Sequence, residues 1–213
     1  MIEQYGVTHR EWRQEAEGDT GYDDIVSPAR KYWSKHILIR LNSGPDESKG
    51  ARITSLTTYN EILDSLQSRG YSEIDTARIY VGGQQESFTR EARWKARGLS
   101  CATKWYPYDA DADKVNKSGA HRADVLEEML EKSLSELGTD RVDIFYLHRA
   151  DRSTPFQETL RTLDRLHKAG KFVQLGLSNY ASYELAEIVL LCKANGWVQP
   201  TVSANINLPM SYS

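Results

Sequence analysis

Apolar residues along this chain alternate between helix-like spacing and short continuous runs. From Gly50 onward, five stretches place apolar residues three or four positions apart, as on one face of a helix, and each ends at a glycine followed by a short apolar run. The helical stretches span residues 59–66, 88–96, 125–137, 156–163 and 185–189, and the apolar runs span 71–74, 99–103, 142–147, 172–177 and 197–202. Five helix–strand units in succession predict a parallel sheet whose strands are joined by helices.

Polar residues at the ends of these runs distinguish between two kinds of parallel sheet. Asp75, Lys104, His148 and the pair Ser178-Asn179 end or directly follow apolar runs. An open doubly wound sheet that binds a dinucleotide carries a Gly-x-Gly-x-x-Gly turn after its first strand, and the sequence has no such turn. In a (β/α)8 barrel, all strand C-termini meet on the face that carries the active site. We therefore predict an α/β fold of the (β/α)8 TIM-barrel type, incomplete, with about five to six βα units.

The two ends of the chain differ from the repeating part. Residues 1–43 are rich in charge and contain one apolar burst, 37–41, which predicts a possible first strand after a poorly ordered arm. Residues 44–202 hold the repeating units, and residues 203–213 continue none of them. The chain therefore divides into an atypical N-terminal arm, a partial barrel and a C-terminal tail.

Composition narrows the class of protein without pointing to a reaction. The chain has 213 residues, of which 39% are hydrophobic and 27% charged, and a formal net charge of −3, which predicts a globular domain and no nucleic-acid or membrane partner. Cys101 and Cys192 lie in apolar segments without metal-ligand spacing, so we expect buried free thiols in a reducing compartment. With no spanning apolar run and no signal-peptide pattern, the predicted location is cytoplasmic.

The strand ends carry groups suited to carbonyl chemistry. Asp75 ends a buried strand, where a carboxylate is costly unless a cation lies nearby. If the strand ends converge, Lys104 is that cation, and its ammonium beside Tyr80 favours the phenolate form of that tyrosine. Such a tyrosine can donate a proton to a carbonyl oxygen and recover it later, while His148 hydrogen-bonds the same oxygen. Since proton donation alone reduces nothing, a hydride donor is also required.

Each of these residues has a structural reading as well. Taken alone, Asp75 is more often a structural acid, Tyr80 a packing residue and Lys104 a solvated side chain. Ser178 and Asn179 could hold an amide such as the carboxamide of nicotinamide, or could cap the helix that follows them. The case for function therefore rests on the combination of residues.

The histidines give no reason to expect a metal. His148 could belong to a hydrogen-bonded turn, and no second histidine stands at a strand end to share a metal with it, which disfavours a metal-dependent barrel hydrolase. The remaining histidines are interpreted as structural; these are His9, His36, His121 and His167. We therefore predict no metal site.

Four motifs resemble successive signatures of the aldo-keto reductases. They are Asp75-Thr76-Ala77-x-x-Tyr80, Ala102-Thr103-Lys104, Leu137-Gly138-Thr139-Asp140-x-Val142-Asp143-Ile144-Phe145-Tyr146-Leu147-His148 and Gly176-Leu177-Ser178-Asn179-Tyr180. The resemblance covers about residues 44–201, keeps the order of the motifs, and is closest to the aflatoxin-aldehyde reductase-like branch, which has many fungal members. It implies an NADPH-dependent carbonyl reductase on a (β/α)8 barrel.

The resemblance also implies catalytic roles for four residues. Carried over residue by residue, Tyr80 would be the proton donor, with Lys104 and Asp75 as the pair that tunes it. His148 would orient the carbonyl group of the substrate.

The same resemblance implies binding roles. Asp75 would approach the nicotinamide side of NADPH, and Ser178 and Asn179 would bind its carboxamide. Trp105 and Tyr106 would line the substrate entrance, although aromatic side chains at these positions could equally be packing residues.

The sequence departs from the family pattern at both ends. Residues 37–41 lack the glycine of the family's first strand, and Ser203-Ala204 stands where a Tyr-Gln pair is expected. The last two strands, with the segment that holds the 2′-phosphate, are not found. We expect a barrel truncated at the C-terminus, with termini altered by a gene-model error or an unspliced intron. The exposed edges of such an open barrel would favour self-association.

Two classes of function stay open. The first is reduction of an aldehyde or ketone to an alcohol, in fungal secondary metabolism or aldehyde detoxification. The alternative is a truncated, catalytically inactive remnant or an interaction protein.

Overall fold

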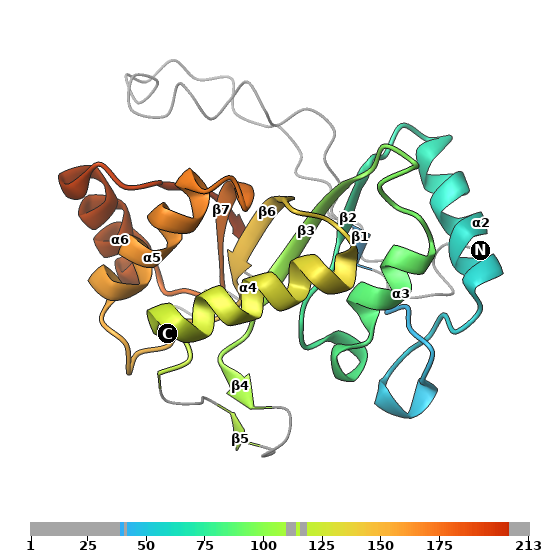
Figure 1. The fold of residues 1–213 in the computed structure, drawn as a ribbon, viewed down its shortest axis with the longest axis horizontal. Coiled ribbons are helices and arrows are strands. Elements are labelled where there is room, and N and C mark those ends of the chain that lie inside the picture. Colours follow the sequence, from blue (N-terminus) through green and yellow to red (C-terminus); the bar gives the residue numbers. More distant parts are fainter. Residues whose placement is uncertain (1–38, 41, 110–113, 116–118, 205–213) are drawn as a thin grey trace, which may run out of the picture.

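Six parallel strands form one sheet in the computed structural model, which describes residues 39–40, 42–109, 114–115 and 119–204. Their order in the sheet is β1 (Ile39–Arg40), β2 (Glu73–Asp75), β3 (Ser100–Trp105), β6 (Val142–Leu147), β7 (Phe172–Ser178) and β8 (Pro200–Ala204). Neighbours in this order are parallel at every pairing (Figure 1). Our predictions for the arm before residue 39 and for the tail after residue 204 lie outside the described residues.

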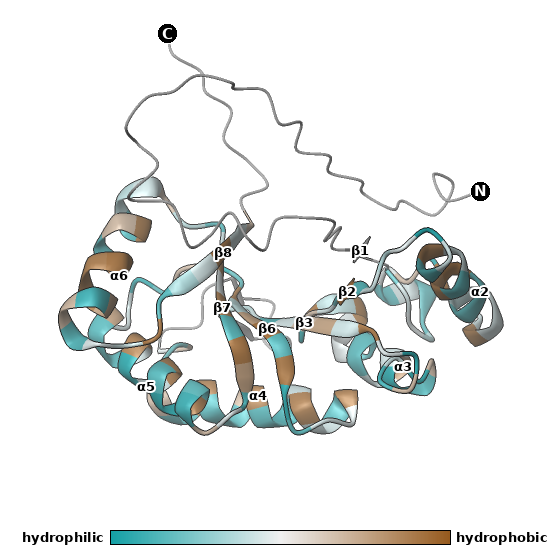
Figure 2. Cartoon of the chain, turned by 90° about the horizontal axis from the view of Figure 1, so that it is seen from above, coloured by the Kyte–Doolittle hydropathy of each residue, from teal (hydrophilic) through white to brown (hydrophobic). Residues whose placement is uncertain are grey.

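Helices cover the outer side of this curved sheet (Figure 2). They are α2 (Leu56–Gln67), α3 (Gln85–Glu91), α4 (Ala123–Leu137), α5 (Phe156–Lys168) and α6 (Ser182–Asn195), with two short 3₁₀ helices, η3 (Glu47–Lys49) and η4 (Tyr80–Gly83). A curled parallel sheet with its helices on the convex side confirms the predicted incomplete (β/α)8 barrel.

The helices form where sequence pattern and end signals agree. The Ser55 hydroxyl accepts a hydrogen bond from the Thr58 backbone N–H at the start of α2, as an N-cap should. Helix α4 ends at Gly138, whose φ of 68° is the left-handed conformation that glycine adopts without strain. Helix α5 buries Leu160 and Leu163 against the sheet. Each such leucine stabilises the fold by about 1.5–3 kcal/mol.

The second predicted helix is too long at its C-terminal end. Helix α3 stops at Glu91, and Arg93 takes a positive φ of 57°. The physical reason is tertiary: the Trp94 indole donates a hydrogen bond to the Leu137 carbonyl at 3.0 Å, at the end of α4. This contact draws the chain out of the helix although its apolar spacing continues to Ala96. A short hairpin of β4 (Tyr108–Asp109) and β5 (Lys114–Val115) was not predicted.

Both cysteines, Cys101 and Cys192, are buried free thiols, as predicted. Within the described part of the chain, no helix has the length and apolar character needed to cross a membrane. The same residues contain no group of three His, Cys, Asp or Glu side chains that could hold a metal ion.

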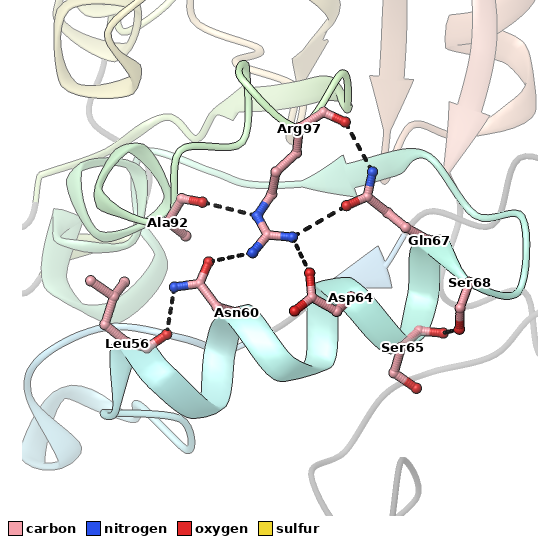
Figure 3. A network of polar contacts seen from close by, with 8 residues as sticks. All are labelled: Leu56, Asn60, Asp64, Ser65, Gln67, Ser68, Ala92 and Arg97. Atoms are coloured by element: carbon pink, nitrogen blue, oxygen red, sulfur yellow. Dashed lines mark hydrogen bonds and ion pairs between the residues drawn. The ribbon is translucent and has the colours of Figure 1, made fainter.

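Arg97 joins α2 to the segment that leads into β3 (Figure 3). Its guanidinium donates to the Ala92 carbonyl at 3.2 Å and to the Asn60 amide oxygen at 2.8 Å. It also pairs with the Asp64 carboxylate and donates to the Gln67 amide oxygen at 3.3 Å. The Gln67 amide in turn donates to the Arg97 carbonyl at 2.9 Å. The planar fork of one side chain thus fixes the outer helix against the sheet.

We expect Arg97→Lys to lower the free energy of unfolding by about 1–3 kcal/mol, because a lysine cannot reproduce these divergent hydrogen bonds. Urea unfolding measures the change. Arg93→Lys is the matched control, since Arg93 is exposed and lies in the same connection. Equal stability of Arg97→Lys and Arg93→Lys would show that the network adds nothing.

Candidate active site

The C-terminal ends of four adjacent strands bring the predicted residues to one edge of the sheet. Asp75 ends β2, Lys104 lies near the end of β3, His148 follows β6, and Ser178 ends β7. These strands are consecutive neighbours in the sheet. Successive strand residues face opposite sides, so the alternating positions that include these four point to the concave side.

Lys104 and Asp75 form a buried ion pair at this edge. The Lys104 ammonium contacts the Asp75 carboxylate and donates a second hydrogen bond to the Thr76 carbonyl at 2.9 Å. Lys104 is 4% exposed and Asp75 7% exposed. Desolvated charges of this kind are retained only when they are paired, so each of the two side chains requires the other. Lys104 is therefore the cation that the sequence led us to expect beside Asp75.

The loop after β2 places Tyr80 beside this ion pair. The backbone of the loop is hydrogen-bonded to β3. The Thr76 N–H donates to the Ala102 carbonyl at 2.8 Å, and the Arg78 N–H donates to the Lys104 carbonyl at 3.1 Å. The Lys104 ammonium lies 5.2 Å from the centre of the Tyr80 ring. This distance is within the range of a cation–π contact and places the positive charge beside the tyrosine.

A second, partly buried ion pair stabilises the conformation of the Tyr80 loop. The Arg78 guanidinium pairs with the Glu86 carboxylate and donates to the Gly83 carbonyl across the η4 turn. Thr103 donates to the same carboxylate at 2.6 Å. Burial raises the pKa of Glu86, while the Arg78 charge acts in the opposite direction. The loop is thereby attached to both α3 and β3.

The His148 ring contacts the rings of two tyrosines. Its ring centre is 5.6 Å from that of Tyr80 and 5.3 Å from that of Tyr106, with both pairs close to perpendicular. Arg149 donates to the Tyr106 hydroxyl at 3.1 Å.

Trp105 faces the helix side of β3, away from Lys104. Its indole donates to the Ala120 carbonyl at 2.8 Å, and its ring packs in the core between sheet and helices. Of the two predicted entrance aromatics, only Tyr106 thus lies beside the other site residues.

Ser178 and Asn179 form the next part of the edge. The Ser178 hydroxyl donates to the Ala204 carbonyl at 2.9 Å. Asn179 has a positive φ of 61°, and its amide donates to the His148 carbonyl at 2.8 Å and to the Ser178 hydroxyl at 2.9 Å. Asn179 is exposed, and none of the hydrogen bonds found for it within the described chain uses its amide oxygen as acceptor.

Two buried polar residues on the concave side, Glu73 and Tyr146, were not predicted. Each stands two positions before a predicted site residue, Asp75 and His148 respectively. The two-residue period of a strand puts such positions on the same face, so this signal was available in the sequence. Both residues are buried.

Burial raises the pKa of Glu73 to about 7, and the charges of Asp75 and Asp143 act in the same direction. Between the ordinary value of 4.5 and 7, the folded chain therefore binds more protons at Glu73 than the unfolded chain does. Stability must fall as pH rises through this window, by about 3 kcal/mol in total. Burial lowers the pKa of His121 to about 4, which makes stability rise with pH over the window below 6.5 and partly masks the Glu73 effect.

Glu73→Gln should remove this penalty without affecting His121. The free energy of unfolding of the variant, relative to that of the unmodified chain, should rise by about 3 kcal/mol from pH 4 to pH 8. Urea unfolding at both pH values measures the difference, with the exposed Glu61→Gln as a control for the loss of one surface carboxylate. A Glu73→Gln profile parallel to the unmodified one would contradict the assignment.

Comparison with known proteins identifies the family. The sequence model of the aldo/keto reductase family matches residues 48–210. The chain is 43% identical over 142 residues to an aldo-keto reductase of Pseudocercospora fijiensis, covering 66% of this chain and 46% of that protein. It is 47% identical over 146 residues to human aldo-keto reductase family 7 member A3, covering 68% and 43%.

A third relative, aflatoxin B1 aldehyde reductase member 2 of Mus musculus, is 47% identical over 138 residues, covering 63% of this chain and 35% of the mouse protein. The chain thus spans less than half the length of these relatives. The match confirms the resemblance carried by the four motifs. The protein belongs to the aldo/keto reductase family, in its aflatoxin-aldehyde reductase-like branch.

Proposed function

We propose that this protein reduces an aldehyde or ketone to an alcohol with NADPH as the hydride donor. One observation carries the proposal: the Lys104 ammonium lies between the Asp75 carboxylate and the Tyr80 ring, with His148 against the same ring. A cation, a phenol and an imidazole at one strand edge match the needs of a carbonyl oxygen that acquires negative charge.

Tyr80 is the proton donor in this proposal. Giving up its proton leaves a phenolate, which the adjacent Lys104 ammonium stabilises. Asp75 holds the ammonium in place by the buried ion pair. His148 orients the carbonyl oxygen toward Tyr80, and Tyr106, which also packs against the imidazole, lines the substrate entrance.

Asn179 and Ser178 are the proposed residues for the nicotinamide carboxamide, next to His148. Asn179 is exposed, and its amide oxygen supports this fit, because a carboxamide N–H₂ is its complementary donor. Asp75 is proposed to face the nicotinamide side of the cofactor. When bound, NADPH would supply the hydride that reduces the carbonyl carbon.

Aldehydes are the proposed substrate class, because the mouse relative is named an aflatoxin B1 aldehyde reductase. A role in aldehyde detoxification follows from this chemistry. Fungal secondary metabolism is the alternative setting, proposed because the chain is similar to the aldo-keto reductase of Pseudocercospora fijiensis.

A second candidate function is an interaction protein without catalysis. Among the strands in the described ranges, β1 and β8 each pair with a single neighbour, so each leaves one edge open. Open strand edges favour pairing with another chain, including a second copy.

Quenching of tryptophan fluorescence by NADPH separates the two candidates. Trp105 faces the helix side of β3 directly beside Lys104, so a reduced nicotinamide bound at this edge should quench part of its emission by energy transfer, without contact. Saturable quenching below millimolar NADPH supports the reductase. A folded chain that shows no quenching at millimolar NADPH would favour the interaction protein.

A further inference from the structure

Tyr146 has no role in the predicted site, yet it is fully buried on the concave side of the sheet. It lies on β6 in register with Lys104 of β3 on one side and with Gly176 of β7 on the other. It forms a small inner cluster with Ala102 and Ile144. The register makes Tyr146 the direct cross-strand neighbour of the catalytic lysine.

Gly176 leaves the space that the Tyr146 ring occupies. The φ of Gly176 is not positive, so its backbone conformation does not require glycine. A Cβ atom at this position would instead collide with the Tyr146 ring. The absence of a side chain at Gly176 therefore fixes where the ring lies.

The ring of Tyr146 forms one wall around the Lys104 ammonium. The ammonium lies 5.5 Å from the centre of the Tyr146 ring and 5.2 Å from that of the Tyr80 ring. Both distances are in the range of cation–π attraction, which is stronger at desolvated sites. The Asp75 carboxylate and the Thr76 carbonyl contact the same ammonium.

The Tyr146 hydroxyl does not contribute to this arrangement. It is buried and has no hydrogen-bond partner within the part of the chain that the structure describes. Burial, and after it the charges of Asp75 and Glu73, raise the pKa of the phenol above its ordinary value. The hydroxyl therefore stays neutral, and the aromatic ring is the part of Tyr146 that acts on Lys104.

We propose that Tyr146 is a positioning residue whose ring, seated over Gly176, holds the Lys104 ammonium against Tyr80. This inference rests on the proposed function, in which Tyr80 is the proton donor. Without the ring, the ammonium loses one wall and moves away from Tyr80, which disfavours the Tyr80 phenolate. The other titratable groups around the lysine are Asp75 and Glu73 from β2, Tyr80 from η4 and His148 after β6.

The test is how close the Lys104 side chain lies to the Tyr80 ring, measured by nuclear Overhauser effects between the Lys104 ε-methylene protons and the Tyr80 ring protons. Tyr146→Leu and Tyr146→Met remove the ring and should weaken or abolish these effects, because the ammonium is no longer held against Tyr80. Tyr146→Phe keeps the ring and should leave the effects unchanged. A purely structural Tyr146 would lower stability in the Leu and Met variants without weakening the contact between Lys104 and Tyr80, and that result would overturn the proposal.

A measurement on the unmodified chain covers the case in which the ring-less variants do not fold. The ε-methylene protons of Lys104, assigned through Lys104→Arg, should resonate upfield of those of the other lysines because two aromatic rings shield them. Ordinary chemical shifts would overturn the proposal. Both measurements are independent of turnover, so a failure of the proposed reductase activity would be recognised separately by the absence of carbonyl reduction.

Discussion

Tyr80→Phe is expected to lower carbonyl turnover by about 10²- to 10⁴-fold, the usual contribution of a positioned acid. Phenylalanine keeps the ring beside the Lys104 ammonium and against His148, so the shape of the site is retained. Only the proton is lost. NADPH should therefore still quench the tryptophan fluorescence of the variant with an unchanged dissociation constant.

Tyr183→Phe is the matched control for this substitution. Tyr183 lies on α6 and is 67% exposed, and none of the site contacts described above involves it. Steady-state assays of both variants with the same aldehyde provide the comparison. Wild-type turnover in Tyr80→Phe would remove Tyr80 from the mechanism.

Lys104→Met is expected to lower the free energy of unfolding by about 3–5 kcal/mol, the usual result of removing one partner of a buried ion pair. Methionine has a similar length and fills the space, but the Asp75 carboxylate keeps its charge in a desolvated position. Turnover should also fall, because no cation remains to stabilise the Tyr80 phenolate. Urea unfolding and the aldehyde assay measure the two effects.

A double variant separates these two effects. Asp75→Asn combined with Lys104→Met removes both charges, and it should recover most of the lost stability without recovering turnover. The exposed Lys193→Met provides a control for the substitution itself. If Lys104→Met were as stable as the unmodified chain, the ion pair would not be the buried, mutually dependent contact described above.

The barrel fold could be predicted because the apolar spacing, the helix end signals and the polar residues at the strand ends all indicated the same fold. The long helices α4 and α5 combine regular apolar spacing with clear end signals, and strand β6 was predicted at its observed bounds. The meeting of Asp75 with Lys104 could be expected as well, since both stand at the ends of strands in a parallel barrel.

Tertiary contacts decided the features that the sequence did not reveal. Helix α3 ends early because Trp94 binds the end of α4, a contact between residues far apart in the chain. The strand of Tyr146 is apolar apart from Asp143, so its pattern predicts a core position for Tyr146, although the two-residue spacing from His148 places Tyr146 on the concave face. Trp105 could have been placed correctly, because it must face away from its neighbour Lys104 on the same strand.

Transfer of deuterium tests the central claim most directly. The protein is incubated with an aldehyde and NADPH that carries deuterium at the transferable C4 position of its nicotinamide ring. The proposed function predicts an alcohol with one deuterium on the former carbonyl carbon, formed by the unmodified chain and by Tyr183→Phe but not by Tyr80→Phe. Absence of deuterated alcohol with the folded, NADPH-binding chain, or equal formation by Tyr80→Phe, would contradict it.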